Sequence, residues 1–324
     1  MKLQHLRAIV EVFKQGLNIS LAAKRLHSSQ PGISKQIRQL EDELGVQIFE
    51  RHGKHLIKVT DAGRELLQIA TDILGKADNL KVVALEHTHP EQGSLKIAAT
   101  NNQLRYQLPR MISAFNTQYP QVSLHIHQNL PAPIVEALIK GEVDFTITAV
   151  VDSVFDSLLM LPCYHFELVA VVPISHPLAI KQPLVLEKLI GYPIITYPIS
   201  FLGKKVLRDL FGSEPLASQT FFTATDPDLI KSYVRSGLGV GIIAKMAVHS
   251  QLDQDLVSLS TSHFLPTITT KIGFMRDKFL RGYMLDFITV FAPHLTKDVI
   301  EMALEQPDNE AVEELFTSFQ LPLK

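Results

Sequence analysis

Residues 28–45 read SSQPGISKQIRQLEDELG, a stretch with the features of a short capped helix. Ser28 or Ser29 can cap the N-terminus, and Pro31 falls in the first turn, where its missing N–H costs nothing. Apolar residues recur at steps of four and three, which is the spacing of one buried helix face. The members of this face are Ile33, Ile37, Leu40 and Leu44.

The residues before this helix predict two more helices. The first has an apolar face at helical spacing, formed by Leu3, Leu6, Val10, Phe13 and Leu17. The second is short, with Asn18 or Ser20 as its cap, and Ala22, Ala23 and Leu26 are expected to face inward. Two short helices, a tight turn and a polar face on the second of them describe a helix-turn-helix.

Residues 48–60, IFERHGKHLIKVT, contain two short extended runs joined by a basic turn with a glycine. This pattern predicts a two-stranded wing. Polar side chains on the capped helix and basic ones in the wing can hydrogen-bond base edges or phosphates. The expected DNA-contacting residues are Ser29, Gln30, Pro31, Ser34, Lys35, Arg38, Arg51 and Lys54, with His52 or His55 nearby. The alternative is a structural three-helix module with a solvated basic face.

The formal net charge of -2 conceals an asymmetry along the chain. Residues 1–60 hold ten Lys or Arg against five Asp or Glu, whereas residues 61–324 hold 21 against 28. A basic head on an acidic body is expected when only the head meets a polyanion. The charge distribution therefore favours double-stranded DNA as the partner of the head.

A long helix is predicted to follow the wing, capped by Thr60 and running over residues 61–86. Its apolar residues form a stripe like a coiled-coil seam, which suggests dimerisation. The stripe consists of Leu66, Ala70, Ile73, Ala77, Leu80 and Ala84. The alternative is that the stripe packs on its own domain. The sequence HTHPEQG at 87–93 ends the helix.

After residue 93, short apolar runs alternate with helical patterns, which predicts an α/β body with parallel sheets and helices on both faces. The expected strands lie at 94–100, 122–128, 144–148, 167–173, 193–197, 219–223, 239–243 and 269–275, with helices near 104–118 and 133–140. About 230 residues are large for one such unit, so two lobes with a cleft are expected. The predicted domains are 1–59, 60–88 and 89–324, the last with lobe I at about 93–163 and 268–324 and lobe II at about 164–267.

Ligands of parallel α/β sheets bind beyond the carboxyl ends of the strands, near helix N-termini. The run Thr-Asn-Asn-Gln at 100–103 follows the first strand of the body directly. Its side chains are neutral hydrogen-bonding groups, which suit an anion or a small polar zwitterion. The sequence therefore predicts a small-molecule site at these four residues.

Other features exclude whole classes of protein. The single cysteine, Cys163, excludes an internal disulfide and suits a reducing cytoplasm. No apolar run approaches the roughly 20 residues that span a bilayer, and the N-terminus lacks a signal-peptide core, so a cytoplasmic protein without a membrane partner is expected. His125 and His127 lack an obvious third ligand. No nucleophile elbow, phosphate loop or His-Glu-x-x-His motif occurs, so we expect no catalytic residue, cofactor or metal.

The phrases SQPGISKQIRQLEDELG, RHGKHL and VTDAG make the head resemble the LysR-type transcriptional regulators. Over the whole chain, MLPCYHFELVAVV, FTATDPDLIKSYVRSGLGVGIIAKMAV, TTKIGFMRDKFLRGYM and FAPHLTKDVI are similar to the sulfur-assimilation members of that family. The resemblance implies a winged helix-turn-helix, a linker helix and a two-lobed effector domain like a periplasmic binding protein. It also implies a homotetramer that binds promoter DNA, works with RNA polymerase and senses an acetylated serine, sulfate or a related anion.

Carried over by position, the resemblance assigns the effector to Thr100, Asn101, Asn102, Gln103, Thr148, Ser200, Leu202 and Thr225. Thr100 and Gln103 match the anion-holding residues of those regulators, and Asn102 replaces a threonine. Ala149 and Leu202 replace two further threonines, and Phe166 replaces a tryptophan. Thr148 and Ser200 lie close enough in the sequence to substitute for the lost hydroxyls. A less anionic or bulkier ligand, such as an organosulfur compound or an aromatic carboxylate, is therefore the alternative within the family.

Two other functions fit the body alone. A solute-binding protein would explain the two lobes, but the basic head and the missing signal peptide argue against it. An enzyme would use the same α/β architecture, but no catalytic constellation or cofactor motif supports it.

Overall fold

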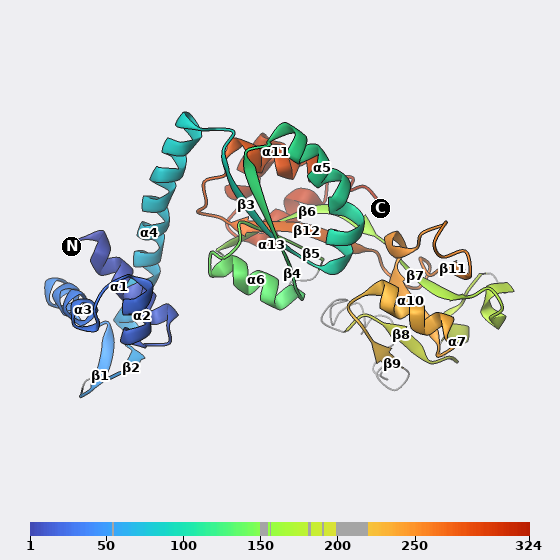
Figure 1. The fold of residues 1–324 in the computed structure, drawn as a ribbon, viewed down its shortest axis with the longest axis horizontal. Coiled ribbons are helices and arrows are strands. Elements are labelled where there is room, and N and C mark those ends of the chain that lie inside the picture. The colour runs from blue at the N-terminus through green and yellow to red at the C-terminus, as the bar shows by residue number, and fades with distance from the viewer. Residues whose placement is uncertain (54, 150–154, 156, 181–182, 190, 199–219) are drawn as a thin grey trace. The chain divides into compact units, whose positions relative to one another are not determined.

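The computed structural model describes residues 1–324 except 54, 150–154, 156, 181–182, 190 and 199–219 (Figure 1). The chain divides into two compact units. The first, here called the head unit, comprises Met1–Thr88 with Asp277–Phe279, and the second, the effector unit, comprises His89–Arg276 with Leu280–Lys324. Each unit is described by itself.

The head unit is a helix-turn-helix followed by a wing and a long helix, as predicted. Its elements are α1 (Leu3–Lys14), α2 (Ile19–Arg25), α3 (Gln30–Leu44), β1 (Phe49–His52), β2 (His55–Val59) and α4 (Asp61–Thr88). The caps follow the sequence signals: Asn18 accepts a hydrogen bond from Leu21 N–H, and Ser29 accepts one from Gly32 N–H. Thr60 Oγ1 accepts from Gly63 N–H at 2.8 Å. Strands β1 and β2 pair antiparallel as the wing.

The buried face of each head helix differs in part from the predicted stripe. In α1, Leu3 and Phe13 are exposed (45% and 51%), and Ile9 is fully buried in their place. In α3, Leu44 is 40% exposed although it was expected in the core. The spacing rule fails at these positions because it locates a stripe only to within about one residue around the helix.

Glu41 takes a buried position in the last turns of α3. Its Oε1 accepts hydrogen bonds from Ile48 N–H at 3.0 Å and Phe49 N–H at 3.2 Å. Its Oε2 accepts from the Arg51 guanidinium at 2.7 Å. One carboxylate therefore fixes the start of the wing against α3.

Helix α4 divides its apolar stripe between two environments. Leu67 and Ala70 are buried in the head core, and Leu66 and Ile73 pack partly against it. Leu80, farther along the helix, is 73% exposed. The beginning of the predicted seam thus packs on its own domain, which was the alternative, while its later part is open to solvent.

The effector unit contains two five-stranded sheets, each with its own helices (Figure 1). In lobe I the sheet order is β4-β3-β5-β12-β6, with β3 (Gly93–Ala99), β4 (Val122–Gln128), β5 (Phe145–Thr148), β6 (Leu158–Phe166) and β12 (Ile268–Met275). Its helices are η1 (Gln103–Gln107), α5 (Leu108–Gln118), α6 (Pro131–Ile139), α11 (Gly282–Phe291), α12 (Lys297–Leu304) and α13 (Asn309–Phe316).

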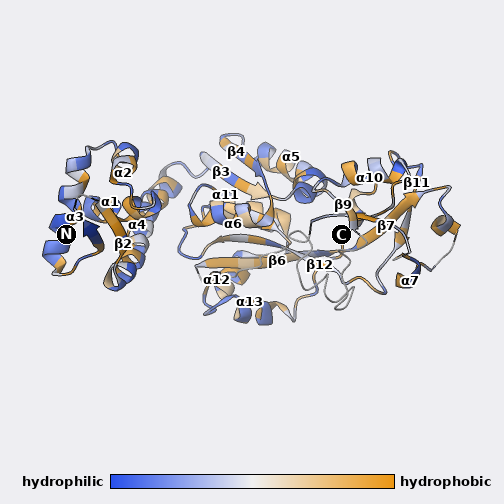
Figure 2. Cartoon of the chain, turned by 90° about the horizontal axis from the view of Figure 1, so that it is seen from below, coloured by the Kyte–Doolittle hydropathy of each residue, from blue (hydrophilic) through white to orange (hydrophobic). Residues whose placement is uncertain are grey.

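Lobe II has the sheet order β11-β7-β10-β8-β9. The strands are β7 (Leu168–Pro173), β8 (Ile194–Thr196), β9 (Thr220–Thr223), β10 (Val240–Ala244) and β11 (Leu256–Ser260). The helical segments are η2 (Pro177–Ile180), α7 (Leu186–Leu189), α10 (Pro227–Arg235) and η4 (Lys245–Ala247). Hydrophobic residues dominate strands such as β6 and β7, whereas α3 in the head is mostly hydrophilic (Figure 2).

The sheets are mixed, and the prediction of parallel sheets was wrong in this respect. Strand β3 is parallel to β4 and β5, but β12 is antiparallel to both β5 and β6. In lobe II, β10 and β8 are parallel, and β7 is antiparallel to β10 and β11. The chain crosses between the sheets at Glu167 and returns between β11 and β12. The first strand after each crossing, β7 in lobe II and β12 in lobe I, runs against the other strands of its sheet.

Strand β6 was not predicted, and Pro162 is the reason. A proline cannot donate a hydrogen bond to a neighbouring strand, so a stretch of sequence that contains one is usually not assigned as a central strand. Here Pro162 pairs with Lys271 and Tyr164 with Thr270, which leaves Cys163 as the extra residue of a bulge. Cys163 is buried, and burial raises the pKa of its thiol.

The predicted helix at 104–118 consists of two parts. Residues 103–107 form a π-helical turn, η1, and α5 begins at Leu108 with Pro109 in its first turn. Because Pro109 has no N–H to donate, it interrupts the α-helical hydrogen-bond pattern, and the helix takes the wider π form just before it. No helix among the described residues is long and apolar enough to span a membrane.

The Glu41 contacts lead to a stability prediction. We expect Glu41→Gln to lower the free energy of unfolding of the head unit by about 1–3 kcal/mol, because Arg51 loses its charged partner. Urea denaturation of the full chain, followed by helical circular dichroism, measures this. Asp42→Asn is the control, since Asp42 lies on the same helix but is exposed and makes no ion pair with any described residue. Equal unfolding midpoints for both variants and the parent would contradict the assigned role of Glu41.

Candidate functional site

The exposed face of α3 presents most of the predicted DNA-contacting residues together. Gln30, Pro31, Lys35 and Arg38 are exposed, Ser34 is half-buried, and Ser29 caps the helix. Within the described part of the chain, Lys35 and Arg38 make no ion pair. Their cationic groups are therefore open to a polyanion, as base or phosphate recognition requires.

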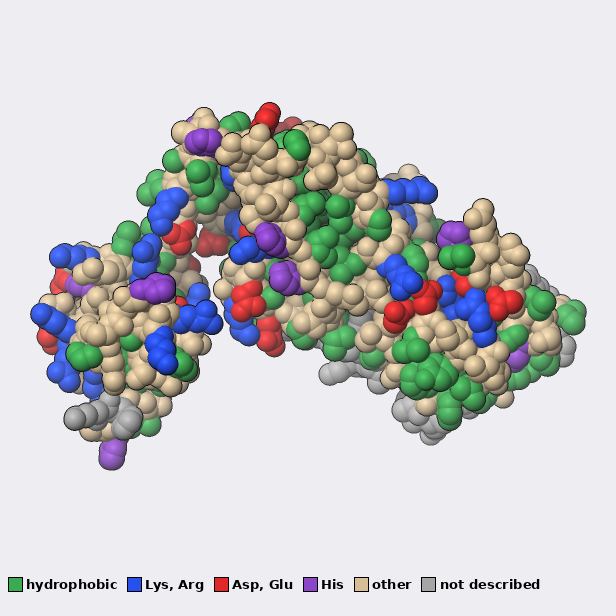
Figure 3. Space-filling view, in the orientation of Figure 1, with side chains coloured by type: hydrophobic (Ala, Val, Ile, Leu, Met, Phe, Trp, Pro, Cys, Tyr) green, Lys and Arg blue, Asp and Glu red, His purple; other side chains and the backbone are tan. Residues whose placement is uncertain are grey.

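Arg51 differs from the other predicted residues of the head. Its guanidinium bonds Glu41, which ties the side chain to the inside of the domain. Lys54, at the tip of the wing, lies outside the described residues. Basic side chains are nevertheless spread over the visible face of the head (Figure 3).

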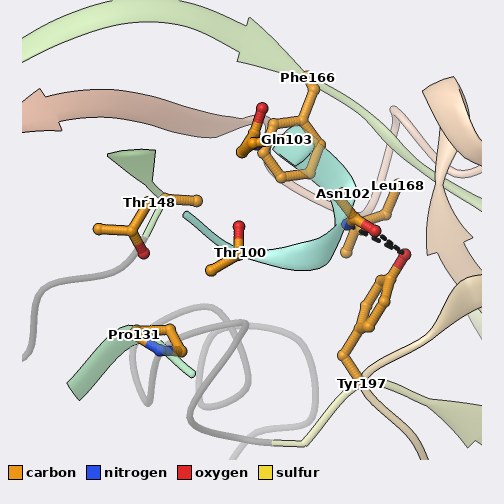
Figure 4. A pocket seen from close by; sticks show the side chains of 9 residues that line it. Thr100, Asn102, Gln103, Pro131, Thr148, Phe166, Leu168 and Tyr197 are labelled. Atoms are coloured by element: carbon orange, nitrogen blue, oxygen red, sulfur yellow. Dashed lines mark hydrogen bonds between the residues drawn. The ribbon is translucent and has the colours of Figure 1, made fainter. Parts of the chain in front are cut away.

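The second site is a pocket in the effector unit, formed where the two lobes meet. The space between its lining residues is about 330 Å³ when the solvent at its open mouth is included. Its lining residues are Thr100, Asn102, Gln103, Pro131, Thr148, Ala149, Phe166, Leu168 and Tyr197 (Figure 4). Thr100 follows β3, Pro131 follows β4, and Thr148 ends β5, so the carboxyl ends of parallel strands converge here, as expected from the sheet rule.

Tyr197 joins the lobes across this pocket. Its hydroxyl lies 3.2 Å from Asn102 Nδ2 and 3.3 Å from Asn102 Oδ1 (Figure 4). The same oxygen accepts a hydrogen bond from Ala244 N–H at 3.1 Å. Burial raises the pKa of Tyr197, so the hydroxyl is neutral at physiological pH. Asn102 of lobe I is thus held against the backbone of β10 through one phenol.

The side chain of Gln103 forms its hydrogen bonds within lobe I. Its amide nitrogen donates to Thr270 Oγ1 at 3.1 Å, and its amide oxygen accepts from the Tyr164 hydroxyl. Gln103 is almost fully buried. Its side chain therefore forms the floor of the pocket with its polar atoms already satisfied by Thr270 and Tyr164.

The structure brings together half of the predicted effector residues. Thr100, Asn102, Gln103 and Thr148 line the pocket, and so do Ala149 and Phe166, two further positions noted as departures from the resembling regulators. Asn101 is buried but does not line the pocket, and Thr225 is half-buried and lies outside the lining. Ser200 and Leu202 lie outside the described residues.

Sequence reasoning missed three lining residues: Pro131, Leu168 and Tyr197. Pro131 follows the end of β4, so the rule that placed the site at Thr100 could have included it. Leu168 and Tyr197 come from lobe II, and no pattern in the sequence states which residues of one lobe face the other.

The pocket offers hydroxyl and amide groups rather than charges. None of the described lining residues is ionised at neutral pH. No group of three or more His, Cys, Asp or Glu among the described residues could hold a metal. The hydroxyl and amide groups of this lining can form hydrogen bonds to a small polar molecule.

Comparison with known proteins identifies the family. Residues 3–64 match the bacterial regulatory helix-turn-helix protein of the lysR family, and residues 88–296 match the LysR substrate binding domain. The chain belongs to the LysR family of transcriptional regulators. Both the predicted family and the predicted architecture of a winged head with a two-lobed effector domain are confirmed.

Relatives that match over nearly their full length are also named as transcriptional regulators. The chain is 48% identical to the HTH-type transcriptional regulator CysB of Haemophilus influenzae over 324 residues, which is all of both chains. It is 38% identical to the HTH-type transcriptional regulator SsuR of Burkholderia cenocepacia, covering 94% of this chain and 99% of that one. The crystal structure of the cofactor-binding domain of the Cbl transcriptional regulator matches with a TM-score of 0.62 and 32% identity, over 66% of this chain and 95% of that one.

The Tyr197 contacts predict a measurable loss of stability. We expect Tyr197→Phe to lower the free energy of unfolding of the effector unit by about 1–2 kcal/mol, because Ala244 N–H and the Asn102 amide both lose a buried partner. Chemical denaturation of the full chain measures this. Tyr192→Phe is the matched control, since the Tyr192 hydroxyl bonds no described residue. A loss of the same size in both variants would contradict the role assigned to the Tyr197 hydroxyl.

Proposed function

We propose that this LysR-type regulator controls genes of sulfur assimilation and cysteine biosynthesis in response to a small molecule bound between its two lobes. The 48% identity to CysB over the full length of both chains carries the proposal. The pocket supports it, because neutral hydroxyl and amide groups at the carboxyl ends of β3 and β5 suit a small polar anion or zwitterion.

We infer that residues 1–59 read promoter DNA, that 60–88 link and pair the subunits, and that 89–324 bind the effector. The polar face of α3 would enter the major groove, with Ser29, Gln30, Pro31, Ser34, Lys35 and Arg38 as contacts and Arg51 and Lys54 near the phosphates. The exposed later part of α4, which includes Leu80, is an apolar surface for pairing two subunits. A dimer of dimers that engages RNA polymerase in the cytoplasm completes the proposal.

The effector is proposed to be an acetylated serine, sulfate or a related anion. Thr100 and Thr148 contribute hydroxyls to the pocket lining, and Asn102 contributes an amide. An organosulfur compound or an aromatic carboxylate is the second candidate. It is favoured by Phe166 and Leu168, which give one wall of the pocket an apolar surface.

The DNA-reading role is testable at Arg38. We expect Arg38→Ala to weaken binding by about 1–3 kcal/mol on a duplex that the full chain selects from a random-sequence pool. Fluorescence anisotropy over a series of salt concentrations measures it. If Arg38 contacts a base, the loss is confined to the selected sequence. If it contacts a phosphate, all duplexes lose affinity and the salt slope falls by about one.

Lys140→Ala is the control for Arg38→Ala. Lys140 is an exposed cation of the effector unit, paired with Glu136, and is not expected to meet DNA. Affinity that is unchanged in Arg38→Ala, or reduced equally in both variants, would remove Arg38 from the proposed contacts.

The effector assignment is testable by calorimetric titration of the full chain with N-acetylserine, O-acetylserine, sulfate and thiosulfate. We expect at least one of them to bind with a dissociation constant in the micromolar to low-millimolar range. Thr100→Val, which keeps the shape of the side chain but removes its hydroxyl, should weaken that binding by about tenfold. No heat from any of the four compounds would contradict the sulfur-linked effector and leave the second candidate.

A further inference from the structure

The π-helical turn η1 contacts both the pocket and the opposite lobe. Gln103, its first residue, lines the pocket. Two of the following side chains reach α10 of lobe II: Arg105 Nη1 lies 3.6 Å from Asp226 Oδ2, and Arg105 Nη2 lies 2.5 Å from Asp228 Oδ2. The Tyr106 hydroxyl donates to Asp228 Oδ1 at 3.4 Å. A change in the position of η1 would therefore alter both the pocket and its contacts with lobe II.

Asp228 is itself held firmly within lobe II. Lys231 Nζ lies 2.8 Å from Asp228 Oδ1 and 2.7 Å from Asp253 Oδ2, and the side chain of Lys231 is only 4% exposed. The same ammonium donates to Ala247 O at 2.8 Å. Burial alone would raise the pKa of Asp253, but hydrogen bonds from His249 N–H, Lys231 and Arg235 lower it overall. Asp228 is thus one end of a largely buried charged cluster. Because its bonds within lobe II hold it in place, it would not follow if η1 moved away.

The contacts across the lobes are more exposed than this cluster. The side chains of Arg105 and Asp228 are 50% and 35% exposed, and charged side chains of both signs lie side by side over α10 (Figure 3). Ion pairs at this exposure are weak and screened by salt. Such contacts can therefore form and break at equilibrium while the cluster behind them stays intact.

The geometry of η1 makes it suitable as a moving part. π-Helical turns are rare, and single turns of this kind inside α-helices are frequently found at functional sites. Here the turn begins at the pocket residue Gln103 and ends immediately before α5. Within the turn, the pocket residue and the two residues that contact Asp228 lie within four positions of one another.

We propose that Arg105 and Tyr106 form a latch on Asp228 that holds the two lobes together, and that Arg105 is a positioning residue that sets how tightly the pocket is closed. The Asn102–Tyr197 contact is the inner connection between the lobes, and this latch is the outer one. The latch acts on lobe closure itself, whichever small molecule occupies the pocket.

Hydrogen–deuterium exchange of the ligand-free, full-length protein, read by mass spectrometry, tests the latch. Arg105→Gln is expected to speed exchange at least threefold in the segments 100–108 and 194–197, which face each other across the pocket. The sheet cores at 169–172 and 271–275, away from the pocket contacts, should keep the parental rate. Arg105→Lys should restore part of the protection, because it keeps the charge but offers fewer hydrogen bonds.

Arg110→Gln is the matched control. Arg110 is an exposed arginine five residues farther along, and it makes no ion pair with any described residue. Tyr106→Phe, which removes one hydroxyl, tests the same latch if Arg105→Gln does not fold, and should give a smaller change in the same two segments. Parental exchange in both segments, or faster exchange spread equally over the sheet cores, would overturn the proposal.

Discussion

The pocket depends on one geometric constraint: strands β3 and β5 end at the same edge of one sheet, and the chain crosses to the second sheet at Glu167, close to that edge. Parallel strands leave backbone amides and polar side chains at their carboxyl ends, where Thr100 and Thr148 lie. The crossing places Phe166 and Leu168 on either side of the same point, so the apolar wall of the pocket comes from the connection between the lobes. The site is therefore a property of the topology, and individual side chains adjust what it binds.

Polar contacts then determine how the two lobes meet at this edge. Tyr197 has one hydroxyl to share between the Asn102 amide and Ala244 N–H, and both partners are buried. Leaving either one unsatisfied costs more than the bond itself contributes, so these groups favour a single arrangement of the cleft. Gln103, by contrast, is occupied within lobe I by Thr270 and Tyr164. Neighbouring residues on one turn thus have different tasks: one supports the floor and another connects the lobes.

The head could be predicted from the sequence because its determinants are local. Asn18, Ser29 and Thr60 each cap the helix that follows within a few residues, and the glycine in the wing turn marks the hairpin. The burial of Glu41 could not be predicted, since a carboxylate in a helix is normally solvated, and its partners Ile48 and Phe49 belong to the next element.

The effector unit was less predictable because its determinants are distant in sequence. Pro162 concealed β6, and the direction of β12 depends on a return from the other lobe. Thr100, Asn102 and Gln103 line the pocket because they follow strand β3, where a general rule applies. Tyr197 meets Asn102 across 95 positions of sequence, and no local pattern contains that information.

The bulge in β6 has a practical consequence for chemical labelling. Cys163 is the only cysteine of the chain, and it is buried within the sheet with its thiol donating to Leu161 O. Thiol reagents attack thiolates, and burial keeps this sulfur protonated as well as inaccessible. A cysteine introduced on the surface would therefore react alone, so a dye or spin label can be attached at a chosen position while the native residue stays in place.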